Sequence, residues 1–138
     1  SDAEAVRAAT QALALAPHNH SVRAGLSLIL ANEARTPSEL DTAQREANAT
    51  LDRLASFVPP RSLPYPTWEQ ITRRVEGQAH AALGLIAFKR DRPGDALREF
   101  ETSVRLSPDP ATHYRLGKLY QVLGRHQEAR KSFEAASA

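Results

Sequence analysis

The stretch "HYRLGKLYQVLGRHQEARKSF", residues 113–133, decides the fold. Its apolar residues recur three and four positions apart, the spacing that places side chains on one face of an α-helix. Gly117 lies in the first half, Ala129 and Phe133 lie in the second, and Gly124 separates the halves. The stretch therefore predicts two amphipathic helices joined by a tight turn, which form a helical hairpin.

The same pattern occurs 33 residues earlier in the chain. The matching pairs are His80 and His113, Leu83 and Leu116, Gly84 and Gly117, Ala96 and Ala129, and Phe100 and Phe133. The interval from Ala to Pro at 96–108 also recurs at 5–17 and at 47–59. Repetition at a fixed interval predicts an array of hairpins.

Helical spacing extends over nearly the whole sequence, whereas the alternation typical of strands is missing from it. Stretches rich in Pro and Gly divide the chain into segments of helical spacing. The segments are roughly 3–16, 20–34, 37–57, 67–90, 94–106, 110–123 and 126–136. Thr36, Thr67 and Asp109 stand where N-caps are expected, because their side-chain oxygens can accept hydrogen bonds from unpaired backbone N–H groups. The sequence therefore predicts an all-α fold of about seven helices.

These residues resemble the tetratricopeptide repeat (TPR) family, whose pattern is aromatic-x-x-Leu-Gly-x-x-Tyr, then Ala-x-x-x-Phe, then Pro. The resemblance implies a right-handed α-solenoid of antiparallel helix hairpins, in which the first helix of each hairpin lines a concave groove. It is clearest over residues 77–138 and weakest over 36–76, where the middle helices are long and irregular. His80 and His113 replace the usual aromatic residue, and Ala87 replaces the usual Tyr.

The resemblance also implies an organisation of residues 1–138 as a single domain. We expect the second helix of a truncated repeat at 1–17, an extended repeat at 18–59, a Pro-rich insertion and helix extension at 60–76, and repeats at 77–109 and 110–138. The sequence contains no Met, so Ser1 is not a translation start. We therefore expect a fragment of a larger protein.

The insertion begins with several prolines between residues 59 and 66, which predict an extended connection. A long helix follows it, and Trp68 lies on an apolar face of that helix. Trp68 either packs within its own chain or stays exposed as an anchor for a partner. Within the chain, it would contact the Pro-rich loop, with Tyr65 and Leu63, or the end of the third helix.

Composition and motifs exclude several classes of protein. The chain has 41% hydrophobic and 25% charged residues, as in ordinary globular domains. It contains no Cys, which excludes disulfides and thiolate chemistry. It also contains neither GxxxxGK[ST] nor GxGxxG, the glycine-rich motifs that bind nucleotides. His18 and His20 are close in sequence, but a solvated turn explains them better than a metal does. We expect no enzyme, no cofactor, no metal site and no membrane span in this chain, and the compartment stays open.

The resemblance implies that concave positions of the first helices contact a partner. The concave face also includes Gln78, Ala81 and Leu85, and the residues predicted to contact the partner are Asn32, Phe88, Lys89, Tyr114, Arg115, Lys118 and Gln121. The groove would be apolar on one side and basic on the other, which suits a protein or peptide with acidic and apolar residues. The Lys/Asn/Arg set that clamps a C-terminal carboxylate in some family members is not reproduced. The alternative is that these residues are solvated helix faces.

We predict a protein–protein interaction or scaffold module that binds a peptide or partner protein in this groove. One alternative is an accessory region of a larger enzyme or of a secretion or assembly machine. Another is RNA binding through the C-terminal half, but residues 69–138 carry only 12 basic against 9 acidic side chains. Such a small excess attracts phosphate weakly, so nucleic acid is not the expected partner. Uncapped ends of a repeat array also favour a homodimer.

Overall fold

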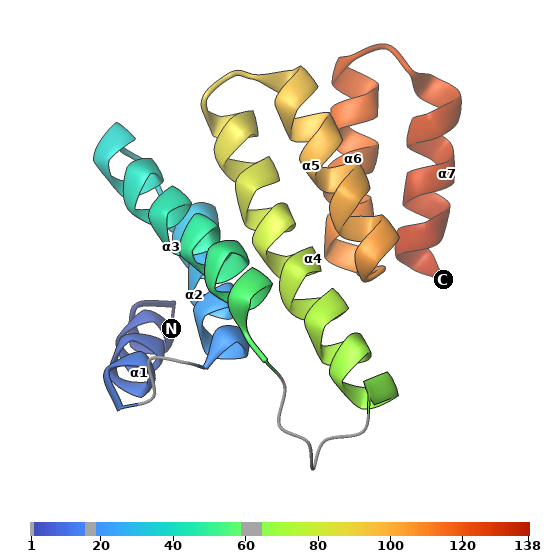
Figure 1. The fold of residues 1–138 in the computed structure, drawn as a ribbon. Helices are drawn as coiled ribbons and strands as arrows, with labels where there is room; N and C mark the ends of the chain where they lie inside the picture. Colours follow the sequence, from blue (N-terminus) through green and yellow to red (C-terminus); the bar gives the residue numbers. More distant parts are fainter. Residues whose placement is uncertain (1, 16–18, 59–64) are drawn as a thin grey trace.

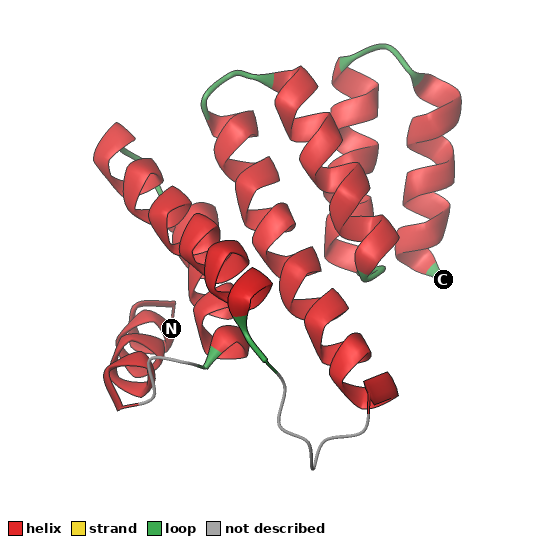
Figure 2. Cartoon of the chain, in the orientation of Figure 1, coloured by secondary structure: helices red, strands yellow, loops and turns green. Residues whose placement is uncertain are grey.

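The structure is a computed structural model, and it describes residues 2–15, 19–58 and 65–138. These residues form seven helices and no strand (Figure 2). The helices are α1 (Asp2–Leu15), α2 (His20–Glu33), α3 (Pro37–Ser56), α4 (Tyr65–Lys89), α5 (Pro93–Leu106), α6 (Pro110–Val122) and α7 (His126–Ser137). Each one begins and ends within two residues of a predicted segment. The all-α prediction is confirmed.

Consecutive helices pack as antiparallel hairpins (Figure 1). α2 packs with α3, α4 with α5, and α6 with α7, while α1 precedes them and packs on α2. The hairpins stack side by side, because α4 also packs on α2 and α3, and α6 packs on α5. The predicted helical repeat array is therefore present.

Two of the three predicted N-caps are confirmed. Thr36 Oγ1 accepts a hydrogen bond from the Glu39 N–H at 3.1 Å, and Asp109 Oδ2 accepts one from the Thr112 N–H at 3.0 Å. The prediction for Thr67 is wrong, because α4 begins at Tyr65 and Thr67 lies inside its first turn. The prolines do not delay the helix, since the first turn has no intrahelical partner for the N–H group that proline lacks.

Two glycines determine how closely the helices of a hairpin approach. A Cβ atom on Gly84 would lie 2.6 Å from the ring of Phe100, and one on Gly117 would lie 2.7 Å from the ring of Phe133. Both distances are far below van der Waals contact, so each ring lies directly against the backbone of the facing helix. Phe100 is only 1% exposed, so its ring cannot move aside without disturbing the core. The 33-residue repeat of the sequence is thus a repeat of this contact.

The middle of the array departs from the regular repeat through its longer helices. α3 has 20 residues and α4 has 25, against 14 in α5. At 1.5 Å per residue, α4 is about 37 Å long. Its first turns extend past α5 and lie along the lower part of α2 and α3 (Figure 1).

A small second core holds these extra turns of α4 in place. Val75 is fully buried together with Ala24 of α2 and Leu54 of α3, and Trp68 packs against this group. The Trp68 ring centroid lies 5.0 Å from that of Phe57, the residue that ends α3. Trp68 is thus half buried against the end of the third helix. Leu63 and the Tyr65 side chain lie outside the described residues.

Neighbouring hairpins are joined by different contacts. At the end of α4, the Arg90 guanidinium donates hydrogen bonds to Gln44 at 2.7 Å and to Asp41 at 2.6 Å, which joins α4 to α3. The last hairpin is joined to α5 by the Tyr120 hydroxyl, which donates to Glu101 Oε1 at 2.9 Å. Among the described residues, α6 packs on α5 and α7 but hardly contacts α4. The neighbouring first helices α4 and α6 are therefore splayed apart.

The substitution Gly84→Ala is expected to destabilise the fold by about 1–3 kcal/mol, because the new methyl group would overlap the buried Phe100 ring. Gly25→Ala is the matched control, since a Cβ atom there meets nothing within 4 Å. The control should be neutral or stabilise the protein by up to about 1 kcal/mol through helix propensity. Urea unfolding followed by circular dichroism measures both changes. Equal stability of the two variants would contradict the role assigned to this contact.

Tyr120 should make the stability of the protein pH-dependent in the alkaline range. Burial and the hydrogen bond to Glu101 raise its pKa to about 12, whereas tyrosine in an unfolded chain has a pKa of about 10. The stabilisation that corresponds to this raised pKa is complete below pH 10. It is lost between pH 10 and 12, where the Tyr120 hydroxyl ionises in the unfolded chain but not in the folded protein.

Replacing Tyr120 by Phe should remove this part of the pH dependence, and the difference in unfolding free energy between wild type and variant measures it. Tyrosinate absorbance at 295 nm provides the direct titration. The Tyr114→Phe variant is the control, and the late transition should persist in it. A late transition that also persists in Tyr120→Phe would rule out the assignment.

Candidate partner-binding groove

A groove of about 270 Å³ lies between the C-terminal halves of α4 and α6. It is lined by Leu85, Phe88, Phe100, Arg115, Lys118, Gln121 and Val122. Phe100 comes from α5, the helix on which both α4 and α6 pack. The groove therefore exists because α6 rests on α5 without closing against α4.

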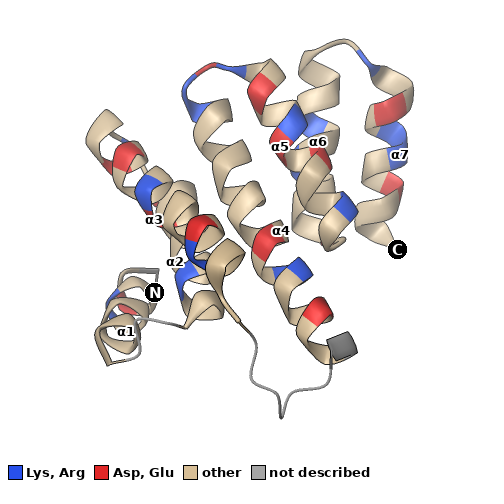
Figure 3. Ribbon diagram, viewed as in Figure 1, with Lys and Arg blue, Asp and Glu red and all other residues tan. Residues whose placement is uncertain are grey.

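The floor and walls of the groove are apolar. Leu85 and Phe100 are buried, but Phe88 is 49% exposed and Val122 is 72% exposed. Single exposed apolar side chains are common on protein surfaces, whereas two that share one groove form a candidate contact site. The sequence explains this apolar wall, because residues 77–88 of α4 contain no Lys, Arg, Asp or Glu (Figure 3).

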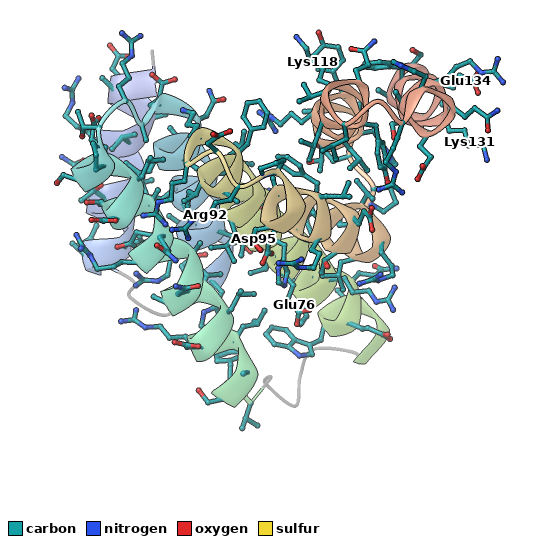
Figure 4. The ribbon with its side chains drawn as sticks, turned by 90° about the horizontal axis from the view of Figure 1, so that it is seen from above. Glu76, Arg92, Asp95, Lys118, Lys131 and Glu134 are labelled. Atoms are coloured by element: carbon teal, nitrogen blue, oxygen red, sulfur yellow. The ribbon has the colours of Figure 1, made fainter. Side chains whose placement is uncertain are left out.

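The rim of the groove is basic. Arg115 and Lys118 come from α6, and no Asp or Glu among the described residues lines the groove. Within the described part of the chain, neither side chain forms an ion pair. The Lys118 ammonium lies 5.5 Å from the centre of the Tyr114 ring, and Figure 4 shows Lys118 on the side of α6 away from α5. The rim thus places two positive charges beside an exposed apolar surface.

The structure brings together four of the residues that the sequence assigned to a groove. Phe88, Arg115, Lys118 and Gln121 all line it. Tyr114 is 51% exposed on α6, but its ring packs on Phe133 with centroids 5.7 Å apart, so it borders the groove without lining it.

Lys89 and Asn32 do not line the groove and instead contact each other. The Lys89 ammonium donates hydrogen bonds to the backbone carbonyls of Asn32, at 2.7 Å, and of Ala34, at 2.9 Å. These carbonyls lie at the C-terminal end of α2, where a helix leaves its acceptors unpaired and attracts positive charge. Burial lowers the pKa of Lys89. Lys89 therefore joins α4 to α2.

Two lining residues were not assigned to the groove from the sequence. Val122 follows Lys118 by four positions and Arg115 by seven, so helical periodicity alone places it on the same face. Phe100 belongs to the repeated pattern of the sequence and packs on Gly84 within its hairpin, but its ring also forms the floor of the groove. No sequence signal reveals this second role, because it depends on the position of α6.

The remaining polar clusters hold the fold together. The His80 Nδ1 atom lies 2.6 Å from Glu99 Oε2 and links α4 to α5. His20 is buried with its ring 4.8 Å from that of Phe57, and His18 lies outside the described residues. Over the described ranges, no group of three or more His, Cys, Asp or Glu could hold a metal ion. No helix in those ranges is long and apolar enough to cross a membrane.

Residues 110–137, which comprise α6 and α7, match the family model described as Tetratricopeptide repeat. The α6–α7 hairpin is therefore a tetratricopeptide repeat. The matched hairpin contains the Gly117–Phe133 contact, and the preceding hairpin of the TPR array contains its counterpart at Gly84 and Phe100. A search of curated proteins finds none that matches the chain. TPR arrays are in general interaction and scaffold modules without catalytic residues of their own, and their partners are proteins.

The structural role of Lys89 can be separated from that of Lys118. Lys89→Met is expected to lower the unfolding free energy by about 1 kcal/mol, because two carbonyls of α2 lose a charged donor. Lys118→Met removes the same charge from an exposed site and should change stability by less than about 0.5 kcal/mol. Urea denaturation of both variants measures the difference. If both variants match the wild type, Lys89 does not stabilise the α2–α4 junction.

Proposed function

We propose that this TPR array binds a partner protein in the α4–α6 groove, and that the partner inserts an apolar side chain flanked by carboxylates. The observation that carries the proposal is the arrangement of Arg115 and Lys118, without ion-pair partners in the described ranges, beside Phe88 and Val122. An apolar side chain would remove Phe88 and Val122 from water, which contributes about 25 cal/mol per Å² of apolar surface. Carboxylates would pair with the two cations and speed the encounter.

The size of the groove supports a side chain of a macromolecule as its occupant. The groove has a volume of about 270 Å³ and lies between the C-terminal halves of α4 and α6. A site of this size accommodates one or two side chains. Interfaces between proteins commonly depend on a few anchors of this kind, each buried in a pocket.

Two predictions from the sequence remain open beside this proposal. The module can act alone or as the accessory region of a larger enzyme or assembly, and both arrangements use the groove in the same way. The predicted homodimer would form on the open face of the last hairpin, where a hollow of about 600 Å³ is lined by residues that include Ala129, Arg130, Phe133 and Glu134. RNA binding is not proposed, since the described residues of the groove offer two cations and an apolar floor.

Selection from a random peptide library on the immobilised protein tests the proposal. The wild type should select peptides in which an apolar residue is flanked by Asp or Glu. Fluorescence anisotropy should show about tenfold weaker binding by Phe88→Ser and by Lys118→Glu. Lys131→Glu makes the same charge change on the exposed surface of α7 and should bind as the wild type does. Unchanged binding by both groove variants would exclude the groove as the site.

A further inference from the structure

A second pocket continues the groove toward the N-terminal end of α6. It has a volume of about 250 Å³, and its lining includes Arg74, Gln78, Ala81, Ser107, Asp109 and Thr112. Ala81 precedes Leu85 by one turn on α4, and Thr112 precedes Arg115 by about one turn on α6. α4 and α6 run in the same direction (Figure 1), so the two pockets are successive parts of one seam between these helices.

The lower pocket adds a third cation to the seam. Arg74 is exposed, and no ion pair involves it within the described ranges. By contrast, its neighbour Arg73 forms an ion pair with Glu69, in which Nε and Oε1 lie 3.8 Å apart. The carboxylate of Asp109 lines the same pocket but is engaged, since it accepts hydrogen bonds from the backbone N–H and the hydroxyl of Thr112 at 3.0 and 3.2 Å. The seam thus carries Arg115, Lys118 and an apolar site at its upper end, and Arg74 beside the hydrogen-bonded carboxylate of Asp109 at its lower end.

Uncharged polar groups along the seam favour an extended occupant. The Gln78 amide lines the lower pocket and the Gln121 amide lines the upper one, and neither makes a side-chain hydrogen bond among the described residues. Each amide can both donate to and accept from a peptide backbone. An extended segment presents free N–H and C=O groups to such partners, whereas a helix has already paired them.

The length of the seam sets the spacing of the recognised residues. Arg74 and Phe88 are 14 residues apart on α4, which corresponds to about 21 Å along the helix. An extended chain advances about 3.3 Å per residue, so about six residues cover this span.

We propose that the α4–α6 seam binds an extended acidic segment whose apolar anchor enters the groove at Phe88 and whose second acidic group, five or six residues away, meets Arg74. This proposal rests on the proposed function, because it assumes that the upper groove holds the anchor. It adds Arg74 and Gln78 to the binding site, and it assigns the lower pocket to the polar end of the same ligand.

A designed peptide labelled with fluorescein serves as the probe. It carries two aspartates at one end, four serine or threonine spacers, and then a leucine followed by two glutamates. Fluorescence anisotropy compares binding to the wild type, to Arg74→Glu and to the matched control Arg73→Glu. We expect Arg74→Glu to weaken binding about threefold to tenfold, with a smaller effect at high salt, and Arg73→Glu to leave binding unchanged.

A charge exchange gives the decisive comparison. Replacing the two aspartates of the probe by lysines should weaken binding to the wild type and restore it to Arg74→Glu. If both proteins respond equally to the exchange, or if Arg73→Glu loses as much affinity as Arg74→Glu, the second subsite is wrong. Binding that depends on Phe88 and Lys118 but not on Arg74 overturns this inference and leaves the proposed function standing. Binding that depends on none of Phe88, Lys118 and Arg74 overturns both this inference and the proposed function.

Discussion

The contact between a phenylalanine ring and the backbone of a facing glycine is the constraint on which the last two hairpins depend. At Gly84 and Gly117 the rings of Phe100 and Phe133 lie so close that no side chain fits between them. Each contact sets the separation of two antiparallel helices and fills the space between them. Because the contact recurs at the repeat interval, the α4–α5 and α6–α7 hairpins share it.

The groove follows from how these hairpins stack. α6 rests on α5 and hardly contacts α4 in the described part of the chain, so the space above Phe100 stays open. One side of Phe100 completes a hairpin, and the other side forms the floor of the proposed site. A substitution of Phe100 would therefore change folding and binding together, which makes Phe88 and Val122 the better positions at which to probe binding alone.

The charged residues divide into two groups with different roles. Several arginines and Lys89 are satisfied within the fold: Arg23 pairs with Glu46 at 2.7 Å, Arg90 pairs with Asp41, and Lys89 holds the end of α2. The cations along the α4–α6 seam lack such pairs within the described ranges. Charges committed to internal pairs hold helices in position, whereas those on the seam are available to an acidic partner.

The sequence by itself determined the helices, their hairpin pairing and the faces they bury, because these follow from the spacing of residues along one chain. It also assigned Phe88, Arg115, Lys118 and Gln121 to one face of the first helices of neighbouring hairpins, and these four residues line one groove. Only the tertiary structure decided that Lys89 contacts α2, that Trp68 lies against Phe57, and that Phe100 and Val122 complete the groove. These outcomes depend on how far neighbouring helices separate, and periodicity specifies which face a residue occupies but not the distance to the next helix.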